Sequence, residues 1–161
     1  GGQEFGLRSG TENVPAIVGF AKAVELASAV REKEAVRVAT LRNGCWRGIK
    51  KIFPKAQLNG PSLATSHLPP ATGSRISNNL NFYIPGVSGE QLLVSLDLQS
   101  IAVSSGSACA ARSIDPSHVL LAMGHDKARA KNSLRVSLGR MTTKPEIDSF
   151  LKVLVIIKKQ L

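Results

Sequence analysis

The sequence predicts an α+β domain, with a small sheet whose helices pack on one face and with a linker helix in front of it. Two observations predict this fold class. Several segments carry apolar residues at helical spacing, whereas residues 76–84 and 133–138 alternate apolar with polar residues as strands do. The expected order of elements is helix, helix, strand, helix, strand, helix, strand, helix.

The N-terminal part is expected to hold a loop followed by helix. Residues 1–12 are rich in glycine and polar residues without periodicity, so they are interpreted as an extended loop. Asn13 and Pro15 then form a helix start signal. The apolar stripe that follows changes phase after Ser28, which predicts two successive helices, or one long helix with a bend, ending near Phe53.

Turn-forming glycine and proline residues mark 57–74, and shorter elements are expected after them. The first are a strand over 76–84, a helix capped by Ser88 that closes near Asp97, and a short strand over 101–103. The others are a helix over 116–124 with Asp115 as cap and Gly124 at its end, a strand over 133–138, and a final helix capped by Thr143.

The chain is strongly basic, with a net charge of +10 and a pI of about 10.1. Nucleic-acid binding is one interpretation, because Lys and Arg neutralise phosphates. However, aromatic residues make up only 4% of the chain, too few for base stacking, and no nucleic-acid-binding motif is present. An acidic partner protein is therefore the preferred interpretation. Many of the basic residues fall in two blocks: Arg31, Lys33, Arg37, Arg42, Arg47, Lys50, Lys51, and then Lys127, Arg129, Lys131.

No signal for export or membrane insertion is apparent. The apolar run at 153–157 is far too short to span a bilayer, and the chain does not open with a charged and then apolar signal segment. Two cysteines cannot build a disulfide framework. A cytoplasmic location is the default expectation.

One cysteine stands in a stretch of very small residues. Residues 103–112 read VSSGSACAAR, with Cys109 followed closely by Arg112. A nucleophilic cysteine needs a thiolate, room for a substrate and freedom to move; small residues give the room, and a nearby arginine favours the thiolate. On spacing alone, a buried structural cysteine is an equal alternative. Cys45, next to the only Trp, is interpreted as a packing residue at the end of a helix.

Three blocks of sequence together resemble the pyridoxal-phosphate-dependent cysteine desulfurases of the NifS/IscS type. They are GGQE with LRSGTENVP at the start, SSGSAC at 104–109, and SLRVSLGRMTT at 133–143. The middle block resembles the branch of that family with a long mobile cysteine loop. The resemblance implies the C-terminal small domain of a fold-type I enzyme, pyridoxal 5'-phosphate as cofactor and L-cysteine as substrate. It also implies a homodimer and sulfur-acceptor or scaffold proteins as partners.

The Ser-x-His-Lys motif that carries the cofactor lysine in that family is absent from these 161 residues. The chain therefore resembles the C-terminal part of a larger enzyme. Residues 1–30 would be a loop and linker helix after a missing large domain, and residues 31–161 the small domain. The expected function is to convert L-cysteine to L-alanine and form a persulfide on Cys109, for iron–sulfur clusters or thiolated RNA. The fragment alone is expected to be inactive; the alternatives are a selenocysteine lyase of the same family or a non-catalytic protein-docking domain.

The resemblance assigns roles to three residues. Cys109 would be the nucleophile that attacks the substrate sulfur, Arg135 would hold the substrate carboxylate, and Thr11 would reach the cofactor phosphate across the dimer. The plain alternatives are a surface arginine on a strand and a turn before a helix. Phe5 departs from the family, which often has arginine there. No Cys/His pair at ligand spacing is present, so no metal site is expected.

Overall fold

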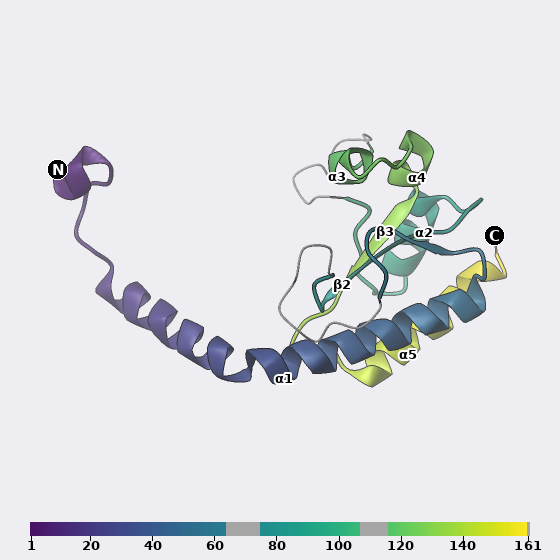
Figure 1. Cartoon of the computed structure of the whole chain (residues 1–161), viewed down its shortest axis with the longest axis horizontal. Helices are drawn as coiled ribbons and strands as arrows, with labels where there is room; N and C mark the ends of the chain where they lie inside the picture. The colour runs from purple at the N-terminus through teal and green to yellow at the C-terminus, as the bar shows by residue number, and fades with distance from the viewer. Residues whose placement is uncertain (64–74, 107–115, 161) are drawn as a thin grey trace. The chain divides into compact units, whose positions relative to one another are not determined.

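The computed structural model describes residues 1–63, 75–106 and 116–160, which divide into a unit of residues 1–34 and a unit that begins at residue 35. One helix, α1 (Val14–Ile52), spans the boundary (Figure 1). Of the two alternatives for this region, a single long helix is therefore the one that forms. Within the described residues, no helix combines the length and the apolar character needed to cross a membrane. The assignment of the two parts as a linker and a small domain stays a prediction.

The first twelve residues fold back on themselves, so the prediction of an extended loop is wrong. They contain a short 3-10 turn, η1 (Gln3–Gly6), and Glu4 within it has a φ of 54°. The Ser9 Oγ donates to the Gly1 carbonyl at 2.6 Å, and the Gly10 N–H donates to Gln3 Oε1 at 3.3 Å. These side-chain to backbone bonds close the loop in a way that periodicity does not reveal.

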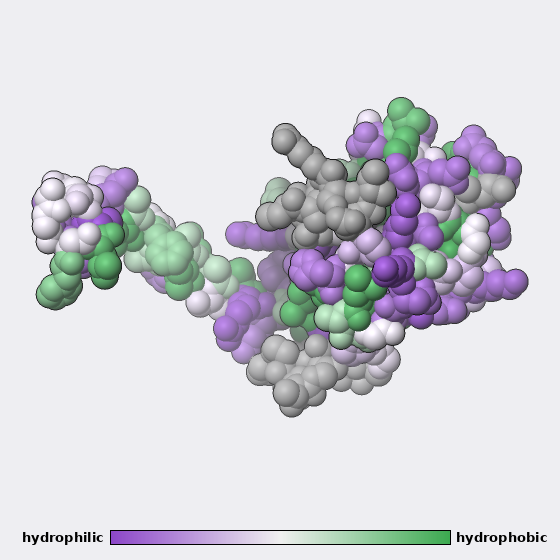
Figure 2. Space-filling view, turned by 90° about the horizontal axis from the view of Figure 1, so that it is seen from above, coloured by the Kyte–Doolittle hydropathy of each residue, from purple (hydrophilic) through white to green (hydrophobic). Residues whose placement is uncertain are grey.

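The first unit has no hydrophobic core of its own, because none of residues 1–34 is buried. The predicted helical stripe is present, but its apolar side chains are solvent-exposed, and hydrophobic patches lie along this unit in Figure 2. The exposed large apolar residues of this unit are Phe5, Leu7, Val14, Ile17, Val18, Phe20, Val24 and Leu26. The stable core of the chain therefore lies in the second unit.

The second unit holds an antiparallel sheet in the order β1-β2-β3, built from β1 (Gln57–Leu58), β2 (Asn79–Tyr83) and β3 (Ser133–Ser137). Strands β2 and β3 lie inside the ranges predicted for them. β1 was not predicted, because its two residues are too few to show alternation. The strand predicted over 101–103 does not form; only Ser104 pairs with β3. The Ile101 N–H instead bonds the Leu96 carbonyl at the end of the preceding helix, which keeps this segment out of the sheet.

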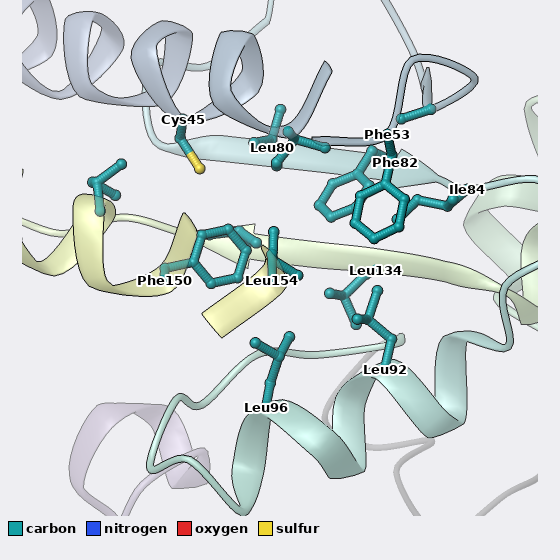
Figure 3. Packing of buried hydrophobic residues seen from close by; sticks show 14 of the residues in the cluster. Cys45, Phe53, Leu80, Phe82, Ile84, Leu92, Leu96, Leu134, Phe150 and Leu154 are labelled. Atoms are coloured by element: carbon teal, nitrogen blue, oxygen red, sulfur yellow. The ribbon is translucent and has the colours of Figure 1, made fainter. Parts of the chain in front are cut away.

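Helices cover one face of this sheet, as the predicted fold class requires. Alternation along β2 and β3 buries every second residue, and these side chains join α2 (Gly89–Asp97), α5 (Lys144–Lys158) and the later part of α1 in one core (Figure 3). The largest fully buried hydrophobic side chains are Phe82, Ile49, Leu80, Leu96, Leu134 and Leu154. The opposite face of β2 and β3 is left to polar residues.

Three helix starts form as predicted. Asn13 Oδ1 accepts a hydrogen bond from the Ala16 N–H at 3.1 Å at the start of α1. The Ser88 Oγ accepts a hydrogen bond from the Gln91 N–H at 3.3 Å and caps α2. At the start of α5, the Thr143 N–H and Oγ1 both donate to Glu146 Oε2, at 2.7 Å and 2.9 Å. These bonds, the backbone one first, lower the pKa of the Glu146 carboxyl. Glu146 is therefore held as a carboxylate at the helix N-terminus.

The region from residue 116 to residue 132 differs more from the prediction. α3 (His118–Ala122) is shorter than the predicted 116–124, and Gly124 follows it with a φ of 85°. The predicted cap Asp115 lies outside the described residues. α4 (Lys127–Lys131) was not predicted, because its five residues show no apolar stripe; Asp126 caps it by accepting from the Arg129 N–H at 2.7 Å.

Arginines of the first basic block donate hydrogen bonds to backbone carbonyls within the fold. Arg42 is only 5% exposed and donates to the Ile76 carbonyl at 2.7 Å, and its burial lowers its pKa. Arg37 donates to the Thr142 and Arg140 carbonyls at 2.8 Å and 2.7 Å. Part of the excess positive charge therefore binds backbone carbonyls inside this unit rather than forming a surface for a partner.

Two glycines on α1 should respond in opposite ways to alanine. A methyl group at Gly48 would collide with Leu151 on α5, whose Cδ2 atom would lie 2.7 Å away, whereas at Gly44 it would meet only Arg47 Nη2 at 3.9 Å. Gly44→Ala should raise the free energy of unfolding by about 0.5–1 kcal/mol through helix propensity. Gly48→Ala should lower it by roughly 1 kcal/mol, because overpacking outweighs that gain. Urea unfolding of both variants measures this, and equal effects would contradict the close contact between α1 and α5.

Candidate active site

The polar face of the sheet carries Arg135, the middle residue of the edge strand β3. Leu134 and Val136 on either side of it are buried in the core, so Arg135 faces the other way, among the polar residues of β2 and β3. Its Nε atom is buried, yet it has no hydrogen-bond partner among the described residues. A buried guanidinium N–H without an acceptor is costly unless a ligand supplies one. Arg135 is thus left with one buried donor that has no acceptor among the described residues, and its role in binding a carboxylate stays a prediction.

The segment that leads to Cys109 starts beside this arginine, at Ser104. The Arg135 N–H donates to the Ser104 carbonyl at 2.6 Å, and the Ser104 N–H donates back to the Arg135 carbonyl at 3.1 Å. Ser104 Oγ also bonds the backbone of Gly106, donating to its carbonyl at 2.8 Å. These bonds hold the first residues of the loop against the outer edge of β3. Cys109 itself lies outside the described residues, so its role stays a prediction.

Thr11 lies in the first unit, between Gly10 and Glu12, with its side chain exposed. The neighbouring Arg8 donates to the Gly10 carbonyl at 2.6 Å and to Glu12 Oε1 at 2.7 Å. Hydrogen bonds from the backbone and from Arg8 lower the pKa of Glu12. Arg8 is therefore already paired with an acid, which leaves the Thr11 hydroxyl as the simpler candidate for binding phosphate. This role also stays a prediction.

A buried polar network that was not predicted from the sequence lies next to Arg135. Asn59 is 2% exposed and its side chain makes three hydrogen bonds. Its Nδ2 donates to Asn81 Oδ1 at 2.6 Å and to Ser133 Oγ at 2.8 Å, while its Oδ1 accepts from Arg129 Nε at 2.7 Å. The asparagines of 78–81 were the available signal, since alternation there places Asn79 and Asn81 on one face. Asn59 and Arg129 gave none, because only the folded chain brings them together.

A cavity of about 240 Å³ lies on the other side of β3, between residues 101–103 and the start of α5. Its lining is mostly apolar and includes Val103, Val136, Leu138 and Phe150. The titratable side chain that lines it is that of Glu146, which the capping bonds of Thr143 already occupy. The polar face around Arg135 therefore offers more chemistry than this cavity does. In the described part of the chain, no three metal-ligating side chains lie together.

Cys45 is fully buried inside α1 and packs in the core (Figure 3), so it is a packing residue. Its position within the helix, seven residues before Ile52, corrects the expectation that it marks a helix end. Burial raises the pKa of its thiol to about 12. At neutral pH almost no thiolate is present there, so Cys45 cannot serve as a nucleophile.

Alkylation of the native chain should therefore label one cysteine. We expect iodoacetamide at pH 8 to modify Cys109 and to spare Cys45, because only a thiolate reacts and the Cys45 thiol is both neutral and buried. Peptide mass spectrometry identifies the labelled residue, and labelling in denaturant, where both should react, is the control. If Cys109 resisted the reagent in the native chain, the alternative of a buried structural cysteine would be favoured.

Comparison with known proteins gives a consistent set of matches. The sequence pattern of the family described as aminotransferase class-V matches residues 2–150. "Cysteine desulfurase IscS" of Clostridium botulinum (strain Hall) is 46% identical over 160 residues, which are 99% of this chain and 38% of the relative. The protein of that name from Dictyoglomus turgidum is 41% identical over 154 residues, or 96% of this chain and 36% of the relative.

Solved structures of similar fold point the same way. A structure titled "NIFS-LIKE PROTEIN" matches with a TM-score of 0.76 and 33% identity, covering 100% of this chain and 38% of that one. The NifS-like protein from Rickettsia africae ESF-5 also has a TM-score of 0.76, with 31% identity over 99% of this chain and 38% of that one. The chain thus spans well under half the length of the curated relatives and structures that it matches.

Proposed function

The chain belongs to the aminotransferase class-V family, and from that premise we propose that it is part of a pyridoxal-phosphate-dependent cysteine desulfurase. The proposed reaction converts L-cysteine to L-alanine and leaves the sulfur as a persulfide on Cys109. The relatives that are named cysteine desulfurases and align over nearly all of the chain support this proposal.

One observation carries the proposal most directly. The buried, unpartnered Nε of Arg135 lies on the strand residue whose backbone is bonded to Ser104, at the start of the cysteine loop. A substrate carboxylate on Arg135 would therefore lie close to the point from which the loop with Cys109 departs. A desulfurase needs this proximity, because its nucleophile must reach the sulfur of an amino acid that is held by its carboxylate.

The residues of this chain suit part of a cofactor site. Pyridoxal 5'-phosphate, when bound, withdraws electrons from the substrate and so allows its C–S bond to break. Thr11 offers an exposed hydroxyl in a glycine-containing loop, which suits a phosphate, whereas Arg8 is paired with Glu12 at 2.7 Å. The Ser-x-His-Lys motif is absent from the 161 residues, so we propose that the cofactor is anchored by a lysine of another segment.

The chemistry assigned to this chain is then sulfur capture. Arg135 binds the substrate carboxylate through its planar guanidinium and orients the side chain of the substrate. The Cys109 thiolate attacks the substrate sulfur, so that an S–S bond forms as the C–S bond breaks. The electron pair of that bond stays with the carbon, which takes up a proton and leaves as alanine. Cys109 retains the sulfur as a persulfide.

Further proposals follow for the complete enzyme. It is a homodimer in which Thr11 reaches the cofactor phosphate of the other subunit. It acts in the cytoplasm and passes its persulfide sulfur to acceptor or scaffold proteins that supply iron–sulfur clusters or thiolated RNA. Specific nucleic-acid binding is not part of the proposal, since several of the arginines are engaged with backbone carbonyls.

The test is to compare the 161-residue chain with a polypeptide that also contains the Ser-x-His-Lys segment. Both are given pyridoxal 5'-phosphate and L-cysteine, and alanine and protein-bound persulfide are measured. We expect alanine and a persulfide on Cys109 from the longer polypeptide and neither from the chain alone. L-selenocysteine is assayed in parallel. Turnover of selenocysteine alone would replace the proposal with a selenocysteine lyase, and turnover of neither would contradict it.

A further inference from the structure

A row of polar residues crosses the sheet at the level of Arg135. The Asn59 N–H donates to the Asn81 carbonyl at 2.9 Å, Asn81 is the register partner of Arg135, and Arg135 exchanges two backbone bonds with Ser104. Directly opposed residues of an antiparallel pair point to the same face. The Asn81 and Arg135 side chains are therefore neighbours on the polar face.

The pairing also brings these two side chains close together. The backbone N–H and carbonyl of Arg135 both bond to Ser104, and the carbonyl of Asn81 accepts from Asn59. These backbone groups therefore do not bond Asn81 and Arg135 to each other. Asn81 and Arg135 thus form a non-hydrogen-bonded pair, in which the Cα atoms are about 4.5 Å apart and the side chains are closest.

The orientation of the Asn81 amide follows from Arg129. A guanidinium can only donate, so the Asn59 atom that Arg129 Nε contacts at 2.7 Å must be the oxygen. The other end of that amide is then the nitrogen, which donates to Asn81 at 2.6 Å. Asn81 must accept there and turns its oxygen toward Asn59. Its two amide N–H groups consequently point away from β1, and among the described residues no acceptor bonds them.

Two sets of donors thus lie side by side without an acceptor among the residues that the structure describes: the amide of Asn81 and the buried Nε of Arg135. No described carboxylate bonds either side chain. Donors that converge in this way suit a carboxylate, whose two oxygens accept several hydrogen bonds. We infer that Asn81 is a second ligand for the carboxylate of the amino-acid substrate, held in its donating orientation by Arg129 and Asn59. This inference rests on the proposed binding of that carboxylate by Arg135.

Asn81→Asp is the sharpest variant, because it keeps an oxygen for Asn59 and replaces the donor with a negative charge. Asn79→Asp is the matched control: it places the same charge on the same strand and face, opposite Ser137 instead of Arg135. Both are made in the complete enzyme carrying Cys109→Ser, so that no turnover disturbs binding. Dissociation constants are measured for L-cysteine and for cysteamine, which lacks the carboxylate. Thermal unfolding midpoints are recorded for each variant.

We expect Asn81→Asp to raise the dissociation constant of L-cysteine by roughly 10- to 100-fold, the size of a lost hydrogen bond to a charged group. The dissociation constant of cysteamine should stay nearly unchanged. Asn81→Ser, which removes the amide without adding charge, should show the same selectivity and covers the case in which the aspartate variant does not fold. Equal weakening of both ligands, no weakening, or the same result from Asn79→Asp would overturn the inference. If Arg135→Gln also left L-cysteine affinity unchanged, the proposed function would fail with it. If Arg135→Gln weakened L-cysteine and the Asn81 variants did not, only this inference would fail.

Discussion

Replacing Cys109 with serine should abolish the conversion of L-cysteine to alanine by the complete enzyme. A hydroxyl is far harder to ionise than a thiol and is a poor nucleophile toward sulfur, so no persulfide can form. Arg135 and the polar network are untouched by this change, so binding of L-cysteine should persist. Alanine production and equilibrium binding, measured on the same preparation, separate the two effects.

The matched control is Cys45→Ala, which removes the other thiol. Cys45 is 0% exposed and packs in the core, so this variant should keep its turnover and lose about 1 kcal/mol of stability. The two cysteines therefore predict opposite patterns, with activity lost at one position and stability lost at the other. Alanine production that survived in Cys109→Ser but not in Cys45→Ala would contradict the assignment of the nucleophile.

The elements that the sequence predicted well are those with both a cap and a stripe. Helix α2 has Ser88 and a row of leucines, and α5 has Thr143 with Glu146 three residues later, so local chemistry marks the start and periodicity marks the length. β1 and α4 have two and five residues, too few for any period to appear. They form because neighbouring parts of the fold hold them, as the bond from Arg129 to the Leu58 carbonyl shows.

The residues of the candidate site also fall into those that the sequence could predict and those that it could not. Arg135 could be anticipated because a charged residue inside an alternating strand must face away from the core. The role of Asn59 could not, since it depends on a side chain 70 residues later in the chain, Arg129, and on the register of β1 against β2. Net charge also leaves the role of each basic residue open, because the sequence cannot tell a solvated arginine from one such as Arg42, which is buried against a backbone carbonyl.

Replacing Arg135 with glutamine should lower kcat/KM for L-cysteine by roughly 10²- to 10³-fold in the complete enzyme, the loss typical of truncating one partner of a buried charged pair. Arg135→Lys keeps the charge but not the planar fork, so it should recover only part of this loss. The free energy of unfolding should stay level or rise, because Arg135 Nε is buried without a partner in the described residues and its removal relieves an unmet donor. Steady-state kinetics and urea unfolding measure the two quantities.

Arg140→Gln serves as the control, because it makes the same change of charge at an exposed residue just beyond β3. Turnover should be nearly unaffected there, since an exposed charge contributes little to a buried site. A large and equal loss of activity in both variants would indicate that net charge, not a specific contact, governs substrate binding. A large loss of stability in Arg135→Gln would instead show that its guanidinium supports the fold. That result would remove the main reason for expecting it to bind a carboxylate, because a residue already satisfied within the protein has no unmet donor to offer a substrate.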